Sequence, residues 1–168
     1  MESLLKDISQ YFKFLKESGQ ERFDISEKSK TTIDEWGISC NGDHNSRIYI
    51  VDSQAVFFSG KAGNLLSKIL QAMNLNKESV CICNDAFPTA LKSRIQRVKP
   101  EVVITLGRES TNSILANNTP FEYLRGRFHE FCDIKVMPTW HPLSLLEDET
   151  KKRDVWEDVK IVMEHLGL

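Results

Sequence analysis

Four short β-rich runs alternate with segments of helical apolar spacing from Arg47 onward, and this alternation constrains the fold more than any other feature. The runs cover residues 47–51, 79–83, 101–105 and 134–137, and the helical segments cover 62–73, 89–98, 108–115 and about 151–166. Continuous apolar runs are typical of strands that are buried on both faces of a parallel sheet. Alternating strands and helices place helices on both faces of that sheet through right-handed crossovers. We therefore predict an α/β fold, a three-layer α/β/α arrangement with a central, mainly parallel four-stranded sheet.

The N-terminal part of the chain has a different character. Residues 2–18 carry apolar side chains at helical spacing and end at Gly19, whereas residues 20–46 are polar and without period. A length of 168 residues suffices for one domain with its own core. We predict a single domain of residues 1–168, with an N-terminal helix (1–19), a long polar connection (20–46) and a core (47–168).

The charge balance gives no global sign of a polyanionic partner. The chain has 22 Lys and Arg against 24 Asp and Glu, a net charge of −2. Any binding of nucleic acid must therefore depend on a local patch. A basic group at Lys92, Arg94, Arg97 and Lys99 is one candidate, although on a helix such a group is most often a solvated face.

Four cysteines bear on the compartment and on metal binding. Cys40, Cys81, Cys83 and Cys132 form no C-x-x-C pair, and no secretory signal precedes them. We expect reduced thiols in a soluble cytoplasmic protein, and no apolar run is long enough to cross a membrane. Cys81 and Cys83 alternate along a buried strand and are most simply core residues, so we predict no metal site.

Polar residues follow the predicted strands at their carboxyl ends. Because these ends share one edge of a parallel sheet, Asp52, Asn84, Gly107 and His141 should come together there. An amide side chain complements the Watson–Crick edge of a pyrimidine, and an imidazole can hold an oxygen that gains negative charge. Each residue also has a plainer interpretation, since Asn84 can be a turn former and His141 a half-buried loop residue.

The segment Phe57-Phe58-Ser59-Gly60-Lys61-Ala62-Gly63 places two aromatic residues before a glycine-flanked helix start. Aromatic faces stack on nucleobases, and a helix N-terminus beside a lysine suits a phosphate or a carboxylate. The alternative is that both rings belong to the core, and Phe57 fits that alternative.

Several motifs resemble the uracil-DNA glycosylase superfamily, and most of all its iron–sulfur family-four branch. Phe58-Ser59-Gly60-Lys61-Ala62-Gly63-Asn64-Leu65-Leu66 is similar to that family's Phe-Val-Gly-Arg-Ala-Gly-x-Leu-Leu, and residues 99–107 are similar to its Pro-Lys-Val-Ile…Leu-Gly strand. Leu124-Arg125-Gly126, Thr139-Trp140-His141-Pro142 and Trp156-Glu157-Asp158-Val159-Lys160 resemble its Leu-Arg-Gly, Thr-Tyr-His-Pro-Ser and Trp-Glu-Asp-Leu-Lys signatures. The resemblance runs in order from about Arg47 to Leu168.

The resemblance implies a role for four residues. Phe58 would stack on an extruded uracil and Asn84 would bind its polar edge. His141 would hydrogen-bond the ring oxygen that becomes anionic as the glycosidic bond breaks. Leu145 would insert into the duplex in place of the flipped base.

The chain departs from the family in two functional regions, the water-positioning motif and the cysteine-rich segment. The family's Gly-Glu-Ala-Pro-Gly motif with its water-positioning carboxylate is replaced by Asp52-Ser53-Gln54-Ala55-Val56, so Asp52 is left as a catalytic candidate together with Ser53. The family's cysteine-rich segment is shortened to residues 85–88, and no N-terminal cysteine pair is present. We therefore expect no cofactor and no iron–sulfur cluster.

The loop after His141 carries Glu147, Asp148 and Glu149. These carboxylates would oppose a DNA backbone, or they would cap the last helix, and the sequence favours neither. Three hypotheses follow. The chain is a binding module for nucleobases or nucleic acid with weak or no catalysis, a minimal glycosylase acting on uracil or another deaminated base, or an interaction protein. We favour the first, with a monomer that binds single- or double-stranded DNA containing a damaged base, or free uracil.

Overall fold

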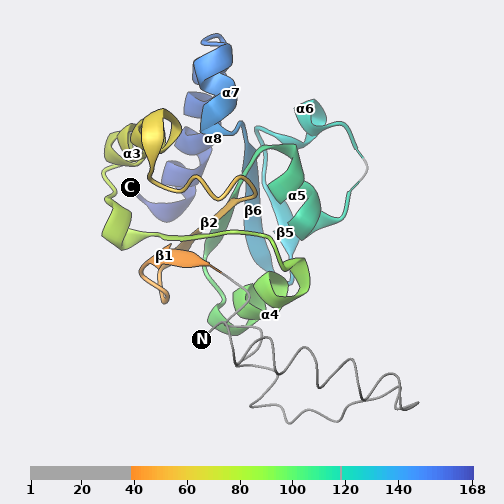
Figure 1. The fold of residues 1–168 in the computed structure, drawn as a ribbon. Coiled ribbons are helices and arrows are strands. Elements are labelled where there is room, and N and C mark those ends of the chain that lie inside the picture. The colour runs from red at the N-terminus through yellow and green to blue at the C-terminus, as the bar shows by residue number, and fades with distance from the viewer. Residues whose placement is uncertain (1–38, 118) are drawn as a thin grey trace, which may run out of the picture. The chain divides into compact units, whose positions relative to one another are not determined.

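A computed structural model describes residues 39–117 and 119–168 (Figure 1). The predicted N-terminal helix and most of the predicted polar connection lie outside these residues. The described part is a central sheet with helices on both faces, so the predicted α/β class and its three layers are confirmed. No helix within the described ranges is long and apolar enough to cross a membrane.

The sheet has six strands in the order β1-β3-β2-β4-β6-β5. They are β1 (Cys40–Gly42), β2 (Ile48–Asp52), β3 (Cys81–Cys83), β4 (Val102–Leu106), β5 (His129–Phe131) and β6 (Ile134–Thr139). The four inner strands are the predicted ones and all pair in parallel. The predicted number of four is wrong, because β1 and β5 add an antiparallel strand at each edge.

The two edge strands escape detection in the sequence for a physical reason. Each has only three residues, of which the middle one is exposed and the two outer ones are half buried, so neither forms an apolar run. β1 lies within the stretch 20–46 that was predicted as a polar connection, so this stretch contains a strand. β5 joins β6 through Cys132 and Asp133, both with positive φ, in a tight hairpin.

The helices cover the two faces of the sheet unequally. They are α3 (Gly60–Ala72), α4 (Pro88–Val98), α5 (Gly107–Leu115), α6 (Phe121–Leu124), α7 (Pro142–Glu147) and α8 (Lys151–Leu166), with a 3-10 turn η1 (Lys77–Ser79). Buried residues of α3, α7 and α8 pack on one face, and buried residues of α4 and α5 pack on the other (Figure 1). The four longer helices match the predicted ones, whereas α6, α7 and η1 are too short to show a period.

Alternate side chains of strand β2 pack into the hydrophobic cores on the two faces of the sheet. Ile48 and Ile50 belong to the core beneath α3 and α8, and Tyr49 and Val51 belong to the core beneath α4. All five residues of the strand are buried, the last of them being Asp52. A carboxylate at the buried end of a central strand needs partners, and these partners define the candidate site.

Two residues of the motifs, Arg125 and Asp158, form a structural ion pair. The Arg125 guanidinium lies 2.8 Å from Asp158 Oδ1, and the Asp158 side chain is fully buried in α8. Thr139 at the end of β6 donates to the other carboxylate oxygen at 2.7 Å. Burial raises the pKa of Asp158, while the hydrogen bond from Thr139 and the charge of Arg125 act against that rise. The pair fixes α8 and the segment after α6 to the end of strand β6.

Candidate active site at the carboxyl ends of the strands

Asp52 and His141 meet at the carboxyl edge of the sheet, as the strand pattern predicted. Asp52 is in register with Leu106 of β4, which is in register with Thr139 of β6. His141 follows two residues later, as the N-cap of α7. His141 Nε2 lies 3.0 Å from Asp52 Oδ1, and both side chains are almost fully buried.

The hydrogen bonds of His141 determine which ring nitrogen carries the proton. The backbone N–H of Leu143 donates to His141 Nδ1 at 3.0 Å, which makes Nδ1 an acceptor. The proton of the neutral imidazole is then on Nε2 and is donated to Asp52. Both ring nitrogens of His141 are therefore occupied by partners within the chain.

The Asp52 carboxylate accepts two further hydrogen bonds from the short segment that follows β2. The backbone N–H of Gln54 donates at 3.0 Å and that of Phe57 at 2.8 Å. Burial would raise the pKa of Asp52, but the bond from His141 and these backbone bonds outweigh burial, and the pKa lies below its usual value. Asp52 is thus an ionised group that ties the shortened 53–57 segment to His141.

Gly107 allows His141 to reach this position. A Cβ at Gly107 would lie 3.3 Å from the Cβ of His141, closer than most such contacts in proteins. Gly107 also has a φ of +84°, which disfavours any residue with a side chain. The strand-to-helix turn of β4 and α5 therefore requires glycine for two independent reasons.

Asn84 lies at the same edge of the sheet but makes a separate contact. Its Oδ1 accepts from the backbone N–H of Ser39 at 3.3 Å, and its backbone N–H donates to Ser39 O at 2.9 Å. The acceptor end of the amide is engaged, while its NH₂ group has no partner within residues 39–117 and 119–168. Asn84 follows Ile82 by two positions, and Ile82 faces the core beneath α3 and α8.

Phe58 is half buried against that same core, and a lysine covers its ring. Lys77 Nζ lies 5.1 Å from the ring centroid, a cation–π distance. Among the described residues, no hydrogen bond or ring contact joins Phe58, Asn84 and His141 to one another. Of the predicted site residues, the structure brings only Asp52 and His141 into direct contact.

Leu145 does not occupy the position that its predicted role requires. Its side chain is 2% exposed and packs in the core with α3 and α8. A side chain that inserts between bases must be exposed, so this burial disagrees with Leu145 as the wedge. Its neighbours Leu143 and Leu146 are 38% and 46% exposed and lie on the outer side of α7.

The acidic residues after α7 take part in the start of α8. Asp148 Oδ1 accepts from the backbone N–H of Thr150 at 3.0 Å and from its hydroxyl at 2.6 Å. Lys152 Nζ lies 2.6 Å from Glu149 Oε1, and Lys151 Nζ lies 3.8 Å from Asp148. These contacts favour the helix-capping interpretation, and the lysines offset much of the local negative charge.

The cysteines differ from the prediction of four reduced thiols. Cys40 of β1 and Cys83 of β3 form a disulfide, whereas Cys81 and Cys132 are free. A four-iron cluster needs four cysteine thiolates around one point. Cys132 lies in the β5–β6 turn, at the opposite edge of the sheet from the other three, so the residues present do not fit such a cluster.

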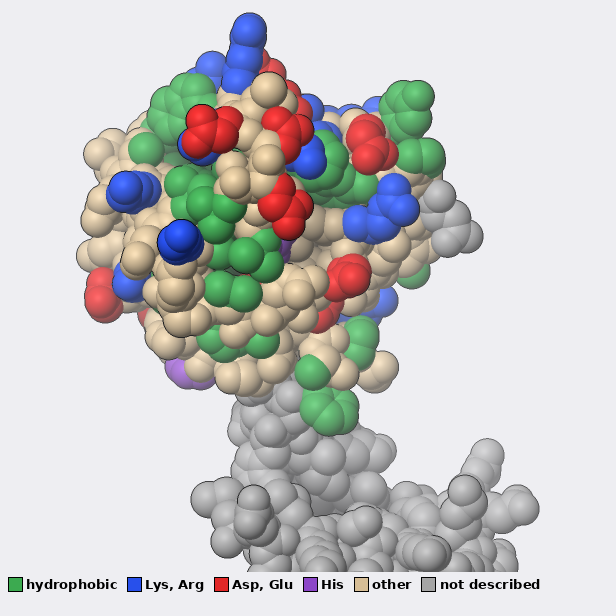
Figure 2. All heavy atoms as spheres, turned by 45° about the horizontal axis from the view of Figure 1, so that its top comes forward, with side chains coloured by type: hydrophobic (Ala, Val, Ile, Leu, Met, Phe, Trp, Pro, Cys, Tyr) green, Lys and Arg blue, Asp and Glu red, His purple; other side chains and the backbone are tan. Residues whose placement is uncertain are grey.

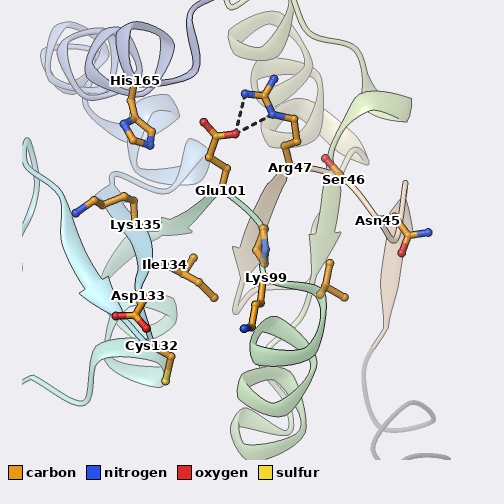
Figure 3. A pocket seen from close by; sticks show the side chains of 12 residues that line it. Asn45, Ser46, Arg47, Lys99, Glu101, Cys132, Asp133, Ile134, Lys135 and His165 are labelled. Atoms are coloured by element: carbon orange, nitrogen blue, oxygen red, sulfur yellow. Dashed lines mark hydrogen bonds and ion pairs between the residues drawn. The ribbon is translucent and has the colours of Figure 1, made fainter.

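A cavity of about 550 Å³ opens at the other end of the sheet, and it is separate from the Asp52–His141 site. Figure 3 shows Arg47 and Glu101 in an ion pair of 2.7 Å at its wall, with Lys135, His165 and Cys132 around it. Its lining carries both signs of charge and comes from the amino ends of β2, β4 and β6 and from α8. It contributes none of the predicted site residues.

Comparison with known proteins agrees with the fold and the motifs. The model of the uracil DNA glycosylase superfamily matches residues 42–160. The chain belongs to this superfamily. The matched range begins in β1 and ends in α8, and it contains Asp52, Asn84 and His141.

Curated relatives of this uracil-DNA glycosylase-like chain include type-4 uracil-DNA glycosylases. The protein of Saccharolobus solfataricus is 29% identical over 136 residues, which cover 66% of this chain and 63% of the relative. That of Thermotoga maritima is 27% identical over 131 residues, covering 61% and 65%. The chain thus spans less than two thirds of the length of each relative. The resemblance to the family-four branch inferred from the motifs is confirmed.

Proposed function

We propose that this uracil-DNA glycosylase-like chain binds a nucleobase or nucleic acid at the carboxyl edge of its sheet and hydrolyses the glycosidic bond weakly or not at all. The observation that carries the proposal is the occupation of both ring nitrogens of His141 by Leu143 and Asp52. An imidazole must offer an N–H to stabilise an oxygen that becomes anionic. Here that N–H is already given to a buried carboxylate.

The state of Asp52 supports weak hydrolysis as well. A group that activates water must be within hydrogen-bond reach of that water. Asp52 is 1% exposed and accepts three hydrogen bonds from its own chain. Loss of a general base lowers the rate of hydrolysis about 10²–10⁴-fold, and loss of a donor to the developing oxyanion lowers it about 10²–10³-fold.

Binding is supported by what surrounds this pair. The NH₂ group of Asn84 has no partner in the described part of the chain, and Phe58 keeps a partly exposed ring. Figure 2 shows the face that contains the carboxyl ends of the strands, where hydrophobic side chains gather among lysine, arginine and acidic side chains. Such a mixed surface fits unstacked bases better than it fits the continuous phosphate backbone of a long duplex. Single-stranded DNA with a deaminated base and free uracil are the proposed ligands.

The test has a catalytic arm and a binding arm. In an alkaline-cleavage assay on a uracil-containing single-stranded oligonucleotide, with protein in excess, we expect excision on the order of 10³-fold or more below that of an active type-4 enzyme. His141→Ala should abolish any residual excision. Rapid turnover at low protein concentration would instead establish an active minimal glycosylase, the alternative function.

The binding arm uses fluorescence anisotropy with oligonucleotides that differ only by uracil or thymine at one position. We expect tighter binding of the uracil strand, with the preference lost in Asn84→Ala. Gln71→Ala, which removes an exposed amide on α3, is the matched control and should keep the preference. Equal affinity for both strands would contradict base recognition and leave the chain as an interaction protein.

A further inference from the structure

Three cysteine sulfurs gather between β1 and β3. The Sγ atoms of Cys40, Cys81 and Cys83 all lie within 4.8 Å of one another. The Cys81 and Cys83 sulfurs are 3.6 Å apart, and Cys40 and Cys83 are joined as a disulfide. None of the three cysteines is among the residues proposed to bind a base.

The strand register brings the three sulfurs together. Cys81 and Cys83 are two positions apart in β3 and therefore point to the same face of the sheet. Cys40 pairs directly with Cys83 across the antiparallel ladder, and the partner of Cys81 is Gly42, which has no side chain. The space beside Cys81 is thus left to the other two sulfurs.

The surroundings of the cluster are mostly apolar, with one arginine nearby. Cys81 and Cys83 are fully buried, and the side chain of Cys40 is half buried, which leaves one side for entry. Tyr49 is in register with Cys81 in the adjacent strand. The Arg94 side chain reaches Tyr49, with Nε 3.5 Å from the Tyr49 hydroxyl, and brings a positive charge to this side of the sheet.

We propose that Cys40, Cys81 and Cys83, once the Cys40–Cys83 disulfide is reduced, bind a single thiophilic d¹⁰ cation of the zinc class through three thiolates. The fourth ligand is a water molecule on the side of Cys40. A complex of one divalent cation with three thiolates carries a net charge of −1, which Arg94 offsets.

The distances suit this ion. Zn–S bonds of about 2.3 Å at tetrahedral angles separate two ligand sulfurs by roughly 3.8 Å. The 3.6 Å between the Cys81 and Cys83 sulfurs is close to that value before any metal is bound. Only Cys40 must move, and its strand lies at the edge of the sheet, where it has one neighbouring strand.

The chemistry balances with an external reductant. A dithiol supplies two electrons and two protons and leaves as its own disulfide. A phosphine supplies the two electrons and leaves as its oxide, with the oxygen atom and the two protons coming from one water molecule. Either route converts the disulfide into the thiols of Cys40 and Cys83. Binding of the cation then releases three protons, one from each thiol. Oxidised protein lacks two of the three ligands and should not bind.

The test uses the full chain, reduced with a phosphine and titrated with Co²⁺ alone under anaerobic conditions. We expect one equivalent of Co²⁺ with intense thiolate-to-metal charge-transfer absorption, and displacement by Zn²⁺. Cys81→Ser should weaken binding at least tenfold, whereas Cys132→Ser should leave it unchanged. Binding that is equal in untreated oxidised protein, or that is unaffected by Cys81→Ser, would overturn the proposal.

A measurement on wild-type protein avoids any dependence on how the variants fold. X-ray absorption of the zinc-loaded reduced chain should give three sulfur neighbours at about 2.3 Å and one oxygen. Two or fewer sulfur neighbours, or no zinc retained after gel filtration, would contradict the site. Uracil excision and oligonucleotide binding do not enter either readout, so the result is independent of the proposed function.

Discussion

His141 donates a hydrogen bond to Asp52 across 3.0 Å, although the two residues are separated by 89 positions in the chain. The contact joins the end of β2 to the start of α7. It uses the single N–H group of the neutral imidazole ring. Asp52 also holds the segment that replaces the family's first motif. The loss of that motif and the occupation of His141 are therefore two aspects of one local structure.

Asp52→Ala should destabilise the fold by about 2–4 kcal/mol, because it leaves three hydrogen-bond donors without their acceptor at a buried site. Urea unfolding at neutral pH measures the change. Ser53→Ala is the matched control and should stay within about 0.5 kcal/mol. An Asp52 variant as stable as the wild type would show that these bonds are easily replaced by water.

The acid stability of the chain should depend on Asp52. The pKa of Asp52 is lowered in the folded state. Its contribution to the free energy of unfolding is therefore complete above the ordinary carboxyl pKa of about 3.9, and it is lost as the pH falls through the lower pKa of the folded state. Asp52→Asn cannot titrate, and its stability should therefore fall less than that of the wild type between about pH 4 and pH 2. Urea unfolding at a series of pH values gives the comparison, and parallel curves for the two proteins would rule the effect out.

Arg125→Met should cost about 3–5 kcal/mol, since it leaves the fully buried Asp158 carboxylate without its cation. Adding Asp158→Asn to that variant should recover part of the loss, as a double-mutant cycle would show. Arg153→Met removes an exposed pair with Glu157 and serves as the control, with an effect of less than about 1 kcal/mol. Additive losses from the two buried positions would mean that the pair is not coupled.

Leu145 and Leu146 should separate stability from binding. Leu145→Ala opens a cavity in the core and should cost about 2–5 kcal/mol, without a specific effect on oligonucleotide affinity at temperatures where it is folded. Leu146→Ala should leave stability nearly unchanged and weaken binding of uracil-containing oligonucleotides several-fold, because its side chain is exposed. Anisotropy and thermal melting of both variants test this. The opposite pattern would restore Leu145 as the residue that contacts DNA.

The sequence predicts the inner sheet well and the edges poorly. Strands such as 102–106 are detectable because every residue is apolar or small and buried on both sides. β1 is a Cys-Asn-Gly segment whose strand conformation depends on pairing with β3, and no local pattern encodes that pairing. The same limit hides the contact between Ser39 and Asn84.

The candidate site is predictable to the level of the sheet edge. The rule that parallel strands end together places Asp52 beside His141 correctly, but it gives no information on which donor meets which acceptor. The phase of the short helix α7 decides that Leu145 is buried and Leu146 exposed, and six residues are too few to reveal that phase. Resemblance to a motif shows which position in the chain corresponds to a family residue. Whether the side chain at that position is exposed depends on local packing.

The disulfide between Cys40 and Cys83 closes a loop across 43 positions that contains β2 and α3. Such a crosslink acts mainly on the unfolded chain, whose freedom it reduces by about 4 kcal/mol at this loop length. A metal ion held by the same sulfurs would close the same loop, so oxidised and metal-bound chains would share this gain. The reduced, metal-free chain would then be the least stable of the three forms, and the one from which β1 separates most easily.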